Sequence, residues 1–355
     1  MKRNSIIIVC LAAVVFVLLW RCTIETAYGP TPYTVEKKVS PGADQFLDSL
    51  QKATSLQDSL QKAASLQDNL RQDYVAMKFG MFLHFNMSTY DRCCCPGCYS
   101  VSGEWGTPNV DPNLFRPGRL NCGQWADVAK SAKCKYMVLV AKHHDGFCLW
   151  NSRYTVYDVG STSWGGGNRD VIREFVDSAR AEGLKVGLYY SIWDKTNGSS
   201  LRFIKGQLAE LLTKYGEIAC IWFDGWNWMV PYGFVPYDTV RNLIKRLQPK
   251  CLIVNNSYVF TTGNTDIIEY EMPLYGPPHI GNALPSEGCQ TIRTDKCWFW
   301  HPGNECSLLP AQTIVDEMNV NNSRNAAYLL DLTPDASGLL PQCQADRMSE
   351  VGLLQ

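Results

Sequence analysis

Two stretches of the chain place acid–base side chains directly after an apolar run. The sequence Lys-His-His-Asp-Gly at 142–146 follows the apolar run 136–141, and Asp224 follows the apolar run 218–223. His and Asp are side chains that move protons or bind polar substrates in active sites. Taken alone, either stretch could also cap a strand and satisfy loop hydrogen bonds. Because the pattern occurs twice, we favour a functional site at which several strand ends meet.

The elements that would position these residues alternate from Met77 onward. Short apolar runs are separated by longer segments with helix-spaced apolar residues, which is typical of strand–helix units around a parallel sheet. Eight strands are expected, at 80–85, 136–141, 185–191, 218–223, 251–255, 266–270, 297–300 and 327–332. Helices are expected at 122–133, 169–182, 201–215, 237–247 and 310–320. Eight strands in a chain of this length favour a (β/α)8 barrel, irregular because its later helices are short or absent.

The N-terminal residues 1–22 have the pattern of a signal peptide or an N-terminal anchor. Lys2 and Arg3 precede the largely apolar residues 5–20, as in secretory signals. At about 1.5 Å per residue the apolar stretch spans roughly 24 Å, less than the ~30 Å hydrocarbon core. Cleavage is therefore favoured, while a membrane anchor and lipidation at Cys22 stay open. We expect an exported protein that is secreted, periplasmic or attached to the cell surface.

Residues 23–76 are expected to form a linker and a helical repeat. The ten residues 49–58 recur almost unchanged at 59–68, are rich in helix formers and contain neither Gly nor Pro. Ten residues at 3.6 per turn do not return to the same helix face, so the leucines form no continuous stripe. We interpret this segment as a tether or surface helix without chemistry. The catalytic domain is then expected over 77–355.

Charge and cysteine content narrow the class of protein. The formal net charge is −1 and no Lys/Arg-rich block occurs, which argues against a nucleic-acid binder. Fifteen cysteines are typical of an exported protein with disulfides, whose pairing the sequence leaves open. The cysteine cluster at 93–98 has no second ligand pair, and adjacent residues such as His143 and His144 point to opposite faces of a strand. We therefore expect no metal and no cofactor.

A sugar is the substrate that best suits the expected site. In a (β/α)8 barrel the active site lies at the C-terminal ends of the strands. Aromatic rings and hydrogen-bonding groups around paired carboxylates suit a sugar, and such a pair suggests glycoside hydrolysis. Asp224 is the favoured nucleophile, although it could instead cap the turn before Gly225. Glu269 and Glu271 both qualify as the acid, because an aromatic environment keeps a carboxyl protonated.

Short motifs run along the chain from Phe79 to about Pro341. They lie at 79–85, 104–105, 124–126, 142–147, 187–191, 222–225 and 329–338. With these motifs the chain resembles the α-L-fucosidases of glycoside hydrolase family 29. The resemblance implies a retaining hydrolase that removes terminal α-linked L-fucose from glycans through a covalent intermediate on Asp224. It also implies that the sugar is contacted by His84, Trp105, His143, His144, Tyr189 and Trp222.

The resemblance does not decide which glutamate is the acid/base, and the chain departs from the family's pattern in two respects. The family places its glutamate at varied positions some forty residues after the nucleophile, so Glu269 fits best, Glu271 is the reserve and Glu287 ranks third. Many members carry an arginine where this chain reads Asn-Asn-Ser at 255–257, so one sugar contact is lost or supplied elsewhere. Many members also continue into a C-terminal β-sandwich, and here we expect no complete one.

Three functions are compatible with these observations. We favour the retaining α-L-fucosidase, whose partner is a fucosylated glycan or glycoconjugate. A non-catalytic fucose- or glycan-binding protein on the same fold is favoured only if neither Glu269 nor Glu271 reaches the pocket. An exo-glycosidase acting on galactose is the third alternative. The sequence does not determine the oligomeric state.

Overall fold

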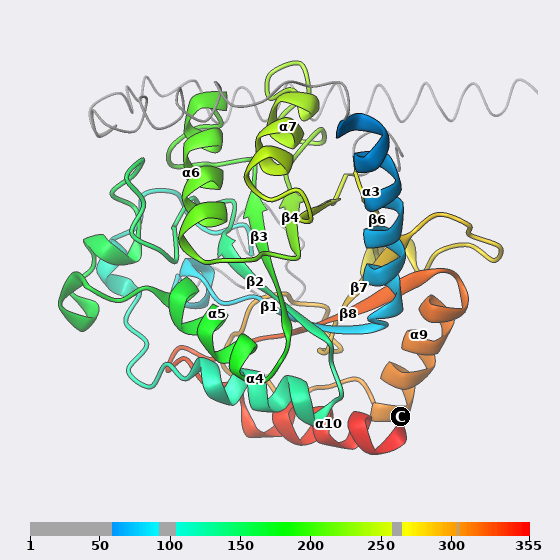
Figure 1. The fold of residues 1–355 in the computed structure, drawn as a ribbon. Coiled ribbons are helices and arrows are strands. Elements are labelled where there is room, and N and C mark those ends of the chain that lie inside the picture. The colour runs from blue at the N-terminus through cyan, green and yellow to red at the C-terminus, as the bar shows by residue number, and fades with distance from the viewer. Residues whose placement is uncertain (1–58, 92–103, 258–264, 304) are drawn as a thin grey trace, which may run out of the picture. The chain divides into compact units, whose positions relative to one another are not determined.

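Eight parallel strands close into a barrel in sequence order (Figure 1). The computed structural model describes residues 59–91, 104–257, 265–303 and 305–355. The strands are β1 (Phe79–Leu83), β2 (Tyr136–Lys142), β3 (Lys185–Ser191), β4 (Cys220–Asp224), β5 (Leu252–Asn255), β6 (Ile267–Glu271), β7 (Ser286–Thr291) and β8 (Ala326–Leu332). Strand β8 pairs with β1, so the described sheet has no edge strand. The predicted (β/α)8 fold is confirmed.

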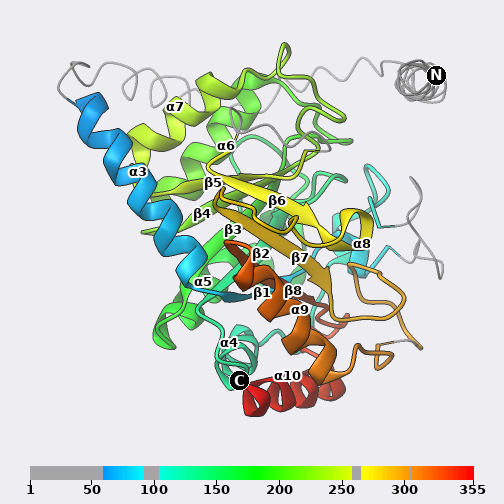
Figure 2. The same ribbon diagram turned by 90° about the vertical axis from the view of Figure 1, so that its right-hand side faces the viewer.

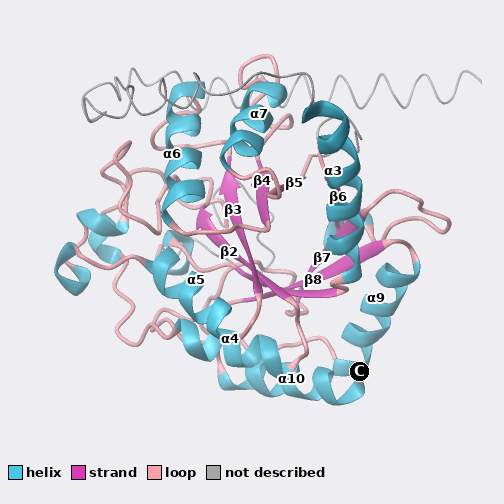
Figure 3. Cartoon of the chain, in the orientation of Figure 1, coloured by secondary structure: helices cyan, strands magenta, loops and turns pink. Residues whose placement is uncertain are grey.

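Helices surround the strands on the outside (Figure 3). They are α3 (Ser59–Ala76), α4 (Cys122–Ser131), α5 (Val171–Ala181), α6 (Leu201–Lys214), α7 (Tyr237–Leu247), α8 (Met272–Tyr275), α9 (Ala311–Ser323) and α10 (Gln342–Leu354). The side chains of Asn121, Asp170 and Ser200 cap α4, α5 and α6 by accepting backbone N–H groups of the first turn. No helix in the described part of the chain is long and apolar enough to cross a membrane.

Strand alternation separates two apolar layers. In β2, Tyr136, Val138 and Val140 belong to the cluster inside the barrel. The residues between them, at 137, 139 and 141, belong to the cluster that packs against the helices. Since both faces of each strand are buried, the strands read as continuous apolar runs, which is why most of them were recognisable in the sequence.

The seventh strand was predicted wrongly. The expected strand at 297–300 is a loop, and β7 is instead the polar segment Ser286–Thr291. Inside the barrel this segment carries Glu287, whose carboxylate is fully buried. A charged, glycine-containing strand lacks the apolar run on which the prediction depended. The apolar run after Cys297 has another explanation. Its aromatic side chains pack over the histidines at the mouth of the barrel, as Trp298 does over His84.

Helix α3 covers the N-terminal ends of the strands (Figure 2). Its Tyr74 is 2% exposed and contacts Tyr136, the first residue of β2, with 5.2 Å between the ring centres. Arg71 lies 3.3 Å from Asp266, just before β6, and Gln67 donates to the Pro249 carbonyl. Helix α3, which begins in the repeat and continues to Ala76, is therefore docked on the barrel as a surface helix. Residues 1–58, with the predicted signal, lie outside the described residues.

One disulfide joins Cys306, before α9, to Cys343 in α10. Six further cysteines are buried thiols: Cys122, Cys134, Cys148, Cys220, Cys251 and Cys289. The expected disulfide bonding is thus confirmed for one pair. The cluster at 93–98 lies outside the described residues.

Candidate active site

A pocket opens at the C-terminal ends of the strands. The six residues expected to contact a sugar all line it: His84, Trp105, His143, His144, Tyr189 and Trp222. Two carboxylates, Asp224 and Glu271, line the same pocket. The barrel therefore gathers into one cavity residues that are nearly 190 positions apart in the sequence. The chemical role of each residue depends on its hydrogen bonds and its protonation state.

Asp224 ends β4 and accepts three hydrogen bonds. The backbone N–H of Gly225 donates to Oδ1 at 2.7 Å, and the Trp228 indole donates to the same oxygen at 3.1 Å. The Tyr189 hydroxyl donates to Oδ2 at 2.9 Å. Burial raises the pKa of Asp224 to about 6, while these three bonds act in the opposite direction. The carboxylate is thus held in place and ionises near neutral pH.

His144 is fixed as one tautomer by Ser191. The Ser191 hydroxyl donates to the Trp193 carbonyl at 2.6 Å, so it accepts the proton on Nδ1 of His144 at 2.7 Å. Burial holds the pKa of His144 well below its usual range. The ring is therefore neutral, and its unprotonated Nε2 lies 3.7 Å from the Asp224 carboxylate. Two hydrogen-bond acceptors face the same space, which suits a hydroxyl donor.

His84 and His143 form the wall beside them. Nδ1 of His84 lies 2.7 Å from Oδ1 of Asp331 on β8. Burial lowers the pKa of His84 and raises that of Asp331, so the pair favours neutral groups that share one proton. His143 stacks on Tyr189 with 5.6 Å between ring centres, and burial lowers the pKa of His143 to about 3. Its buried Nδ1 has no hydrogen-bond partner among the described residues.

The two expected acid/base candidates lie at different depths. Glu269 and Glu271 are two residues apart in β6 and so share a face of the strand. Only Glu271 lines the pocket, where the Asn256 amide donates to its Oε2 at 3.0 Å. Burial, and then the nearby Asp224 charge, raise the pKa of Glu271 to about 7. Glu269, expected first, lies deeper in the barrel beside Glu287, and burial raises its pKa well above the usual range.

Sequence reasoning missed several residues of the pocket. They are Phe82, Glu104, Trp228, Asn256, Leu274, Cys289 and Trp298. Glu104 accepts the backbone N–H groups of Trp298 and Phe299, and burial raises its pKa to about 8. The motif at 104–105 was a signal for this residue, but only Trp105 was assigned a role. Glu104 follows no apolar strand, so the strand-end criterion could not find it.

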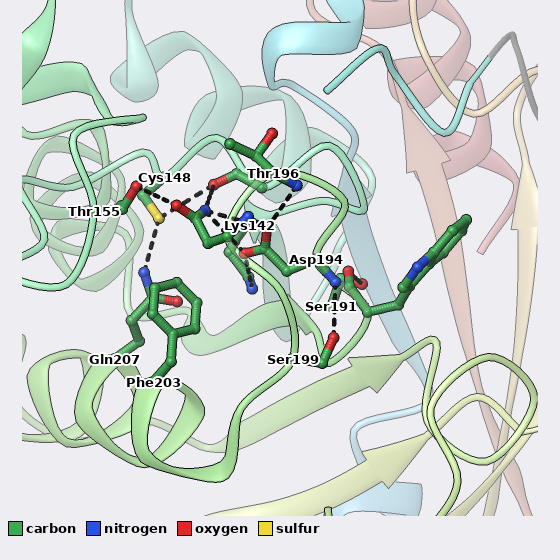
Figure 4. A network of polar contacts seen from close by, with 12 residues as sticks. Lys142, Cys148, Thr155, Ser191, Asp194, Thr196, Ser199, Phe203 and Gln207 are labelled. Carbon is green, nitrogen blue, oxygen red and sulfur yellow. Dashed lines mark hydrogen bonds and ion pairs between the residues drawn. The ribbon is translucent and has the colours of Figure 1, made fainter. Parts of the chain in front are cut away.

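A buried network supports the first histidine-rich strand end (Figure 4). Nζ of Lys142 lies 2.8 Å from Oδ2 of Asp194, and both side chains are fully buried. Oδ1 of Asp194 accepts the backbone N–H of Asn197 at 2.6 Å. In the same loop, the N–H of Lys195 donates to the His144 carbonyl at 2.8 Å. The loop after β3 is thereby bonded to the end of β2 on both sides of His143.

One group in the described residues has the spacing of metal ligands. Ligand atoms of Asp295, Cys297 and His301 lie within 4.8 Å of one another. However, Nη2 of Arg293 lies 2.5 Å from Oδ2 of Asp295 and 2.6 Å from Nε2 of His301. The guanidinium already satisfies these two groups with a positive charge, so the cluster does not fit a metal ion.

Comparisons with known proteins agree with this geometry. A family model described as "Alpha-L-fucosidase" matches residues 110–354. The chain is 35% identical over 294 residues to an α-L-fucosidase 1 of Arabidopsis thaliana, covering 74% of this chain and 54% of that protein. It is 38% identical to the human plasma α-L-fucosidase over 67% of this chain and 54% of that one. The chain thus spans about half the length of these relatives.

Solved structures show the same likeness. An α-L-fucosidase isoenzyme 1 from Paenibacillus thiaminolyticus superimposes with a TM-score of 0.68 at 29% identity, covering 81% of this chain and 76% of that one. A glycoside hydrolase 29 family member from an unknown rumen bacterium gives a TM-score of 0.65 at 29% identity, with coverages of 79% and 55%.

Proposed function

Because this chain belongs to the α-L-fucosidase family, glycoside hydrolase family 29, we propose that it hydrolyses terminal α-linked L-fucose from glycans with retention of configuration. Asp224 is the nucleophile and Glu271 the acid/base in this proposal. The observation that carries it is the presence of both carboxylates in one aromatic pocket, with pKa values raised to about 6 and about 7. Between these values the first is ionised and the second still protonated, as a retaining glycosidase requires.

The first step forms a covalent fucosyl-enzyme. The ionised Asp224 attacks the anomeric carbon, and the bond from that carbon to the glycosidic oxygen breaks. Glu271 gives its proton to the departing oxygen, so the leaving group departs as a neutral alcohol. The Tyr189 hydroxyl and the Trp228 indole, which both donate to Asp224, keep its oxygens aimed at the reacting carbon.

The second step releases fucose. The ionised Glu271 takes a proton from water, and the resulting oxygen attacks the anomeric carbon from the side that the leaving group vacated. The bond to Asp224 breaks, so the two inversions give net retention. Both residues return to their starting protonation states.

Neutral imidazoles suit the recognition of sugar hydroxyls. His143 and His144 are kept neutral by burial, so they bind hydroxyls without a charge; His144 does so through the acceptor Nε2, because its Nδ1 proton is donated to Ser191. The rings of Tyr189 and Trp222, whose centres are 5.4 Å apart with planes at 22°, supply an apolar surface for the sugar. We therefore keep the histidines as binding groups and Glu271, in place of Glu269, as the acid/base.

Hydrolysis of 4-nitrophenyl α-L-fucoside by the purified chain tests the proposal. We expect Asp224→Ala to lower kcat/KM by about 10³-fold or more, and Asp177→Asn, at a surface ion pair, to leave it unchanged. Proton NMR of the first product should show the α anomer. Equal rates for wild type and Asp224→Ala would overturn the nucleophile, and no hydrolysis by the wild type would favour a fucose-binding protein. Faster hydrolysis of the matching β-D-galactoside would favour a galactosidase.

We also propose that the protein is exported. The apolar segment after Lys2 and Arg3 and the disulfide between Cys306 and Cys343 support this, because disulfides persist in oxidising compartments. The N-terminal sequence of the mature protein is the test: an N-terminus at or after residue 22 is expected. Retention of Met1 together with recovery in the cytosolic fraction would contradict export.

A further inference from the structure

A carboxylate that the proposed reaction does not use lies inside the barrel. Glu287, on β7, is 0% exposed. Its Oε2 accepts hydrogen bonds from the hydroxyls of Tyr74 at 2.7 Å and of Tyr136. Its Oε1 accepts the indole N–H of Trp222 at 2.9 Å. Two bonds thus come from the floor of the barrel and one from the pocket.

Hydrogen bonds offset the cost of burying this carboxylate, and besides these three donors the neighbouring Glu269 side chain also contributes one. An ionised carboxyl in an apolar core is unfavourable unless hydrogen bonds replace its hydration. The Tyr74, Tyr136 and Trp222 donors each stabilise the charged form of Glu287 and lower its pKa against the effect of burial. Tyr74 reaches it from α3, so the helix before the barrel completes the site around Glu287. Removal of one donor leaves the Glu287 carboxylate with fewer hydrogen bonds. The side chains of the remaining donors are then held less firmly in place.

Trp222 connects Glu287 to the nucleophile. The indole has a single polar atom, Nε1, and Glu287 is its acceptor. The ring stacks on Tyr189, with 5.4 Å between centres, and the Tyr189 hydroxyl donates to Oδ2 of Asp224 at 2.9 Å. A rotation of the Trp222 ring would therefore change both the apolar surface of the pocket and the support behind Tyr189.

We propose that Glu287 is a positioning residue, anchored from below by Tyr74 of α3, that fixes the Trp222 ring and through it the Tyr189 hydroxyl on Asp224. This inference rests on the proposed function, because it assigns Glu287 a role in preparing the nucleophile. It assigns α3 a role in the active site as well, since Tyr74 is the one donor to Glu287 that comes from outside the barrel strands in the described structure.

The pH dependence of hydrolysis distinguishes positioning from stability. The Tyr189 hydrogen bond lowers the pKa of Asp224, so a displaced Tyr189 raises it. For Glu287→Leu we expect kcat/KM to fall by about tenfold to 100-fold and the acidic limb of its pH profile to move to higher pH, with the alkaline limb unmoved. Glu287→Gln keeps an acceptor for Trp222 and should recover much of this loss.

A matched control alters the same kind of contact elsewhere. The Trp150 indole donates to Glu210 at 2.9 Å, outside the pocket. Glu210→Gln should lower the melting temperature and leave both limbs of the pH profile in place.

Tyr74→Phe removes one donor to Glu287 and is the milder variant. It should move the acidic limb in the same direction as Glu287→Leu, but by less. Its control is Tyr328→Phe, which removes a buried hydroxyl that donates to Glu317 at 2.7 Å.

A spectroscopic measurement keeps this inference separate from the activity. The indole N–H resonance of Trp222, assigned by its loss in Trp222→Phe, should move in Glu287→Gln and in Tyr74→Phe and stay in Glu210→Gln. An inactive wild type with these shifts would refute the proposed function and keep the contact between Glu287 and Trp222. An unmoved Trp222 resonance in Glu287→Gln, or an unshifted acidic limb in Glu287→Leu, would overturn the positioning role.

Discussion

The two carboxyls of the pocket differ in the neighbours that oppose the effect of burial on their pKa values. Asp224 receives three hydrogen bonds, from a backbone N–H, a hydroxyl and an indole. Glu271 receives hydrogen bonds from the side chains of Asn256 and Trp298 and also experiences the negative charge of Asp224. Both pKa values rise, but that of Glu271 rises higher, to about 7 against about 6. The proposed division into nucleophile and acid rests on these environments.

A narrow bell-shaped pH profile follows at the residue scale. Because Asp224 must be ionised, kcat/KM should rise as pH increases through about 6, and because Glu271 must be protonated, it should fall through about 7. Initial rates on 4-nitrophenyl α-L-fucoside between pH 4 and 9 measure both limbs. Glu271→Gln should lose the alkaline limb and keep the acidic one. An alkaline limb that survives in Glu271→Gln would show that another group is the acid.

At the scale of elements, the pocket depends on loops that join neighbouring strands. Lys142, at the end of β2, and Asp194, in the loop after β3, form an ion pair with both side chains fully buried. Such a pair specifies one arrangement of the two loops, because separating the charges leaves each of them buried and unpaired. His143 and His144 follow Lys142 directly and are held by this arrangement.

Asp194→Asn should therefore be strongly destabilising. Removing one partner of a buried ion pair costs about 3–5 kcal/mol, measured as the free energy of unfolding in urea. Asp177→Asn provides the comparison, because its pair with Arg173 is 3.8 Å long and exposed and should be worth less than about 1 kcal/mol. A loss below about 1 kcal/mol in Asp194→Asn would contradict the structural role of this ion pair.

The positions of the strands were predictable from the sequence where both faces of a strand are buried and apolar. β2 and β4 are apolar on both faces and were found with small shifts at their ends. β7 was not found, because its buried Glu287 is satisfied by Tyr74, Tyr136 and Trp222 from distant parts of the chain. No local pattern contains that information, so a polar strand inside a barrel reads as a loop.

At the scale of the whole molecule, the barrel concentrates carboxyls that burial keeps protonated. Burial raises the pKa of Asp145 to about 7 and that of Glu104 to about 8, in addition to Glu271 at about 7. In the unfolded chain these groups ionise near pH 4. The folded state therefore binds more protons than the unfolded state between these limits.

The melting temperature should accordingly fall as pH rises from 6.5 to 8.5. A carboxyl whose folded pKa is raised contributes stability that is lost as pH increases through that pKa. The buried histidines oppose this trend only up to about pH 7.5, because they lose their protons around pH 6.5 in the unfolded chain and are already neutral in the folded one. Differential scanning calorimetry should show a decrease of about 2–4 °C for each kcal/mol lost. Glu104→Gln should flatten the upper part of the curve, and a melting temperature constant from pH 6.5 to 8.5 would contradict the raised values.

The sequence by itself predicted the barrel, seven of its eight strands, and the positions of Asp224 and the histidines at strand ends. These depend on periodicity and on short motifs, which are local properties of the chain. Only the tertiary structure decided that Glu271 lines the pocket while Glu269 lies beneath it. It also revealed that Glu104 belongs to the pocket and that α3 closes the floor through Tyr74. The depth of a side chain in a barrel is set by the tilt and register of neighbouring strands, which arise only when distant segments pair.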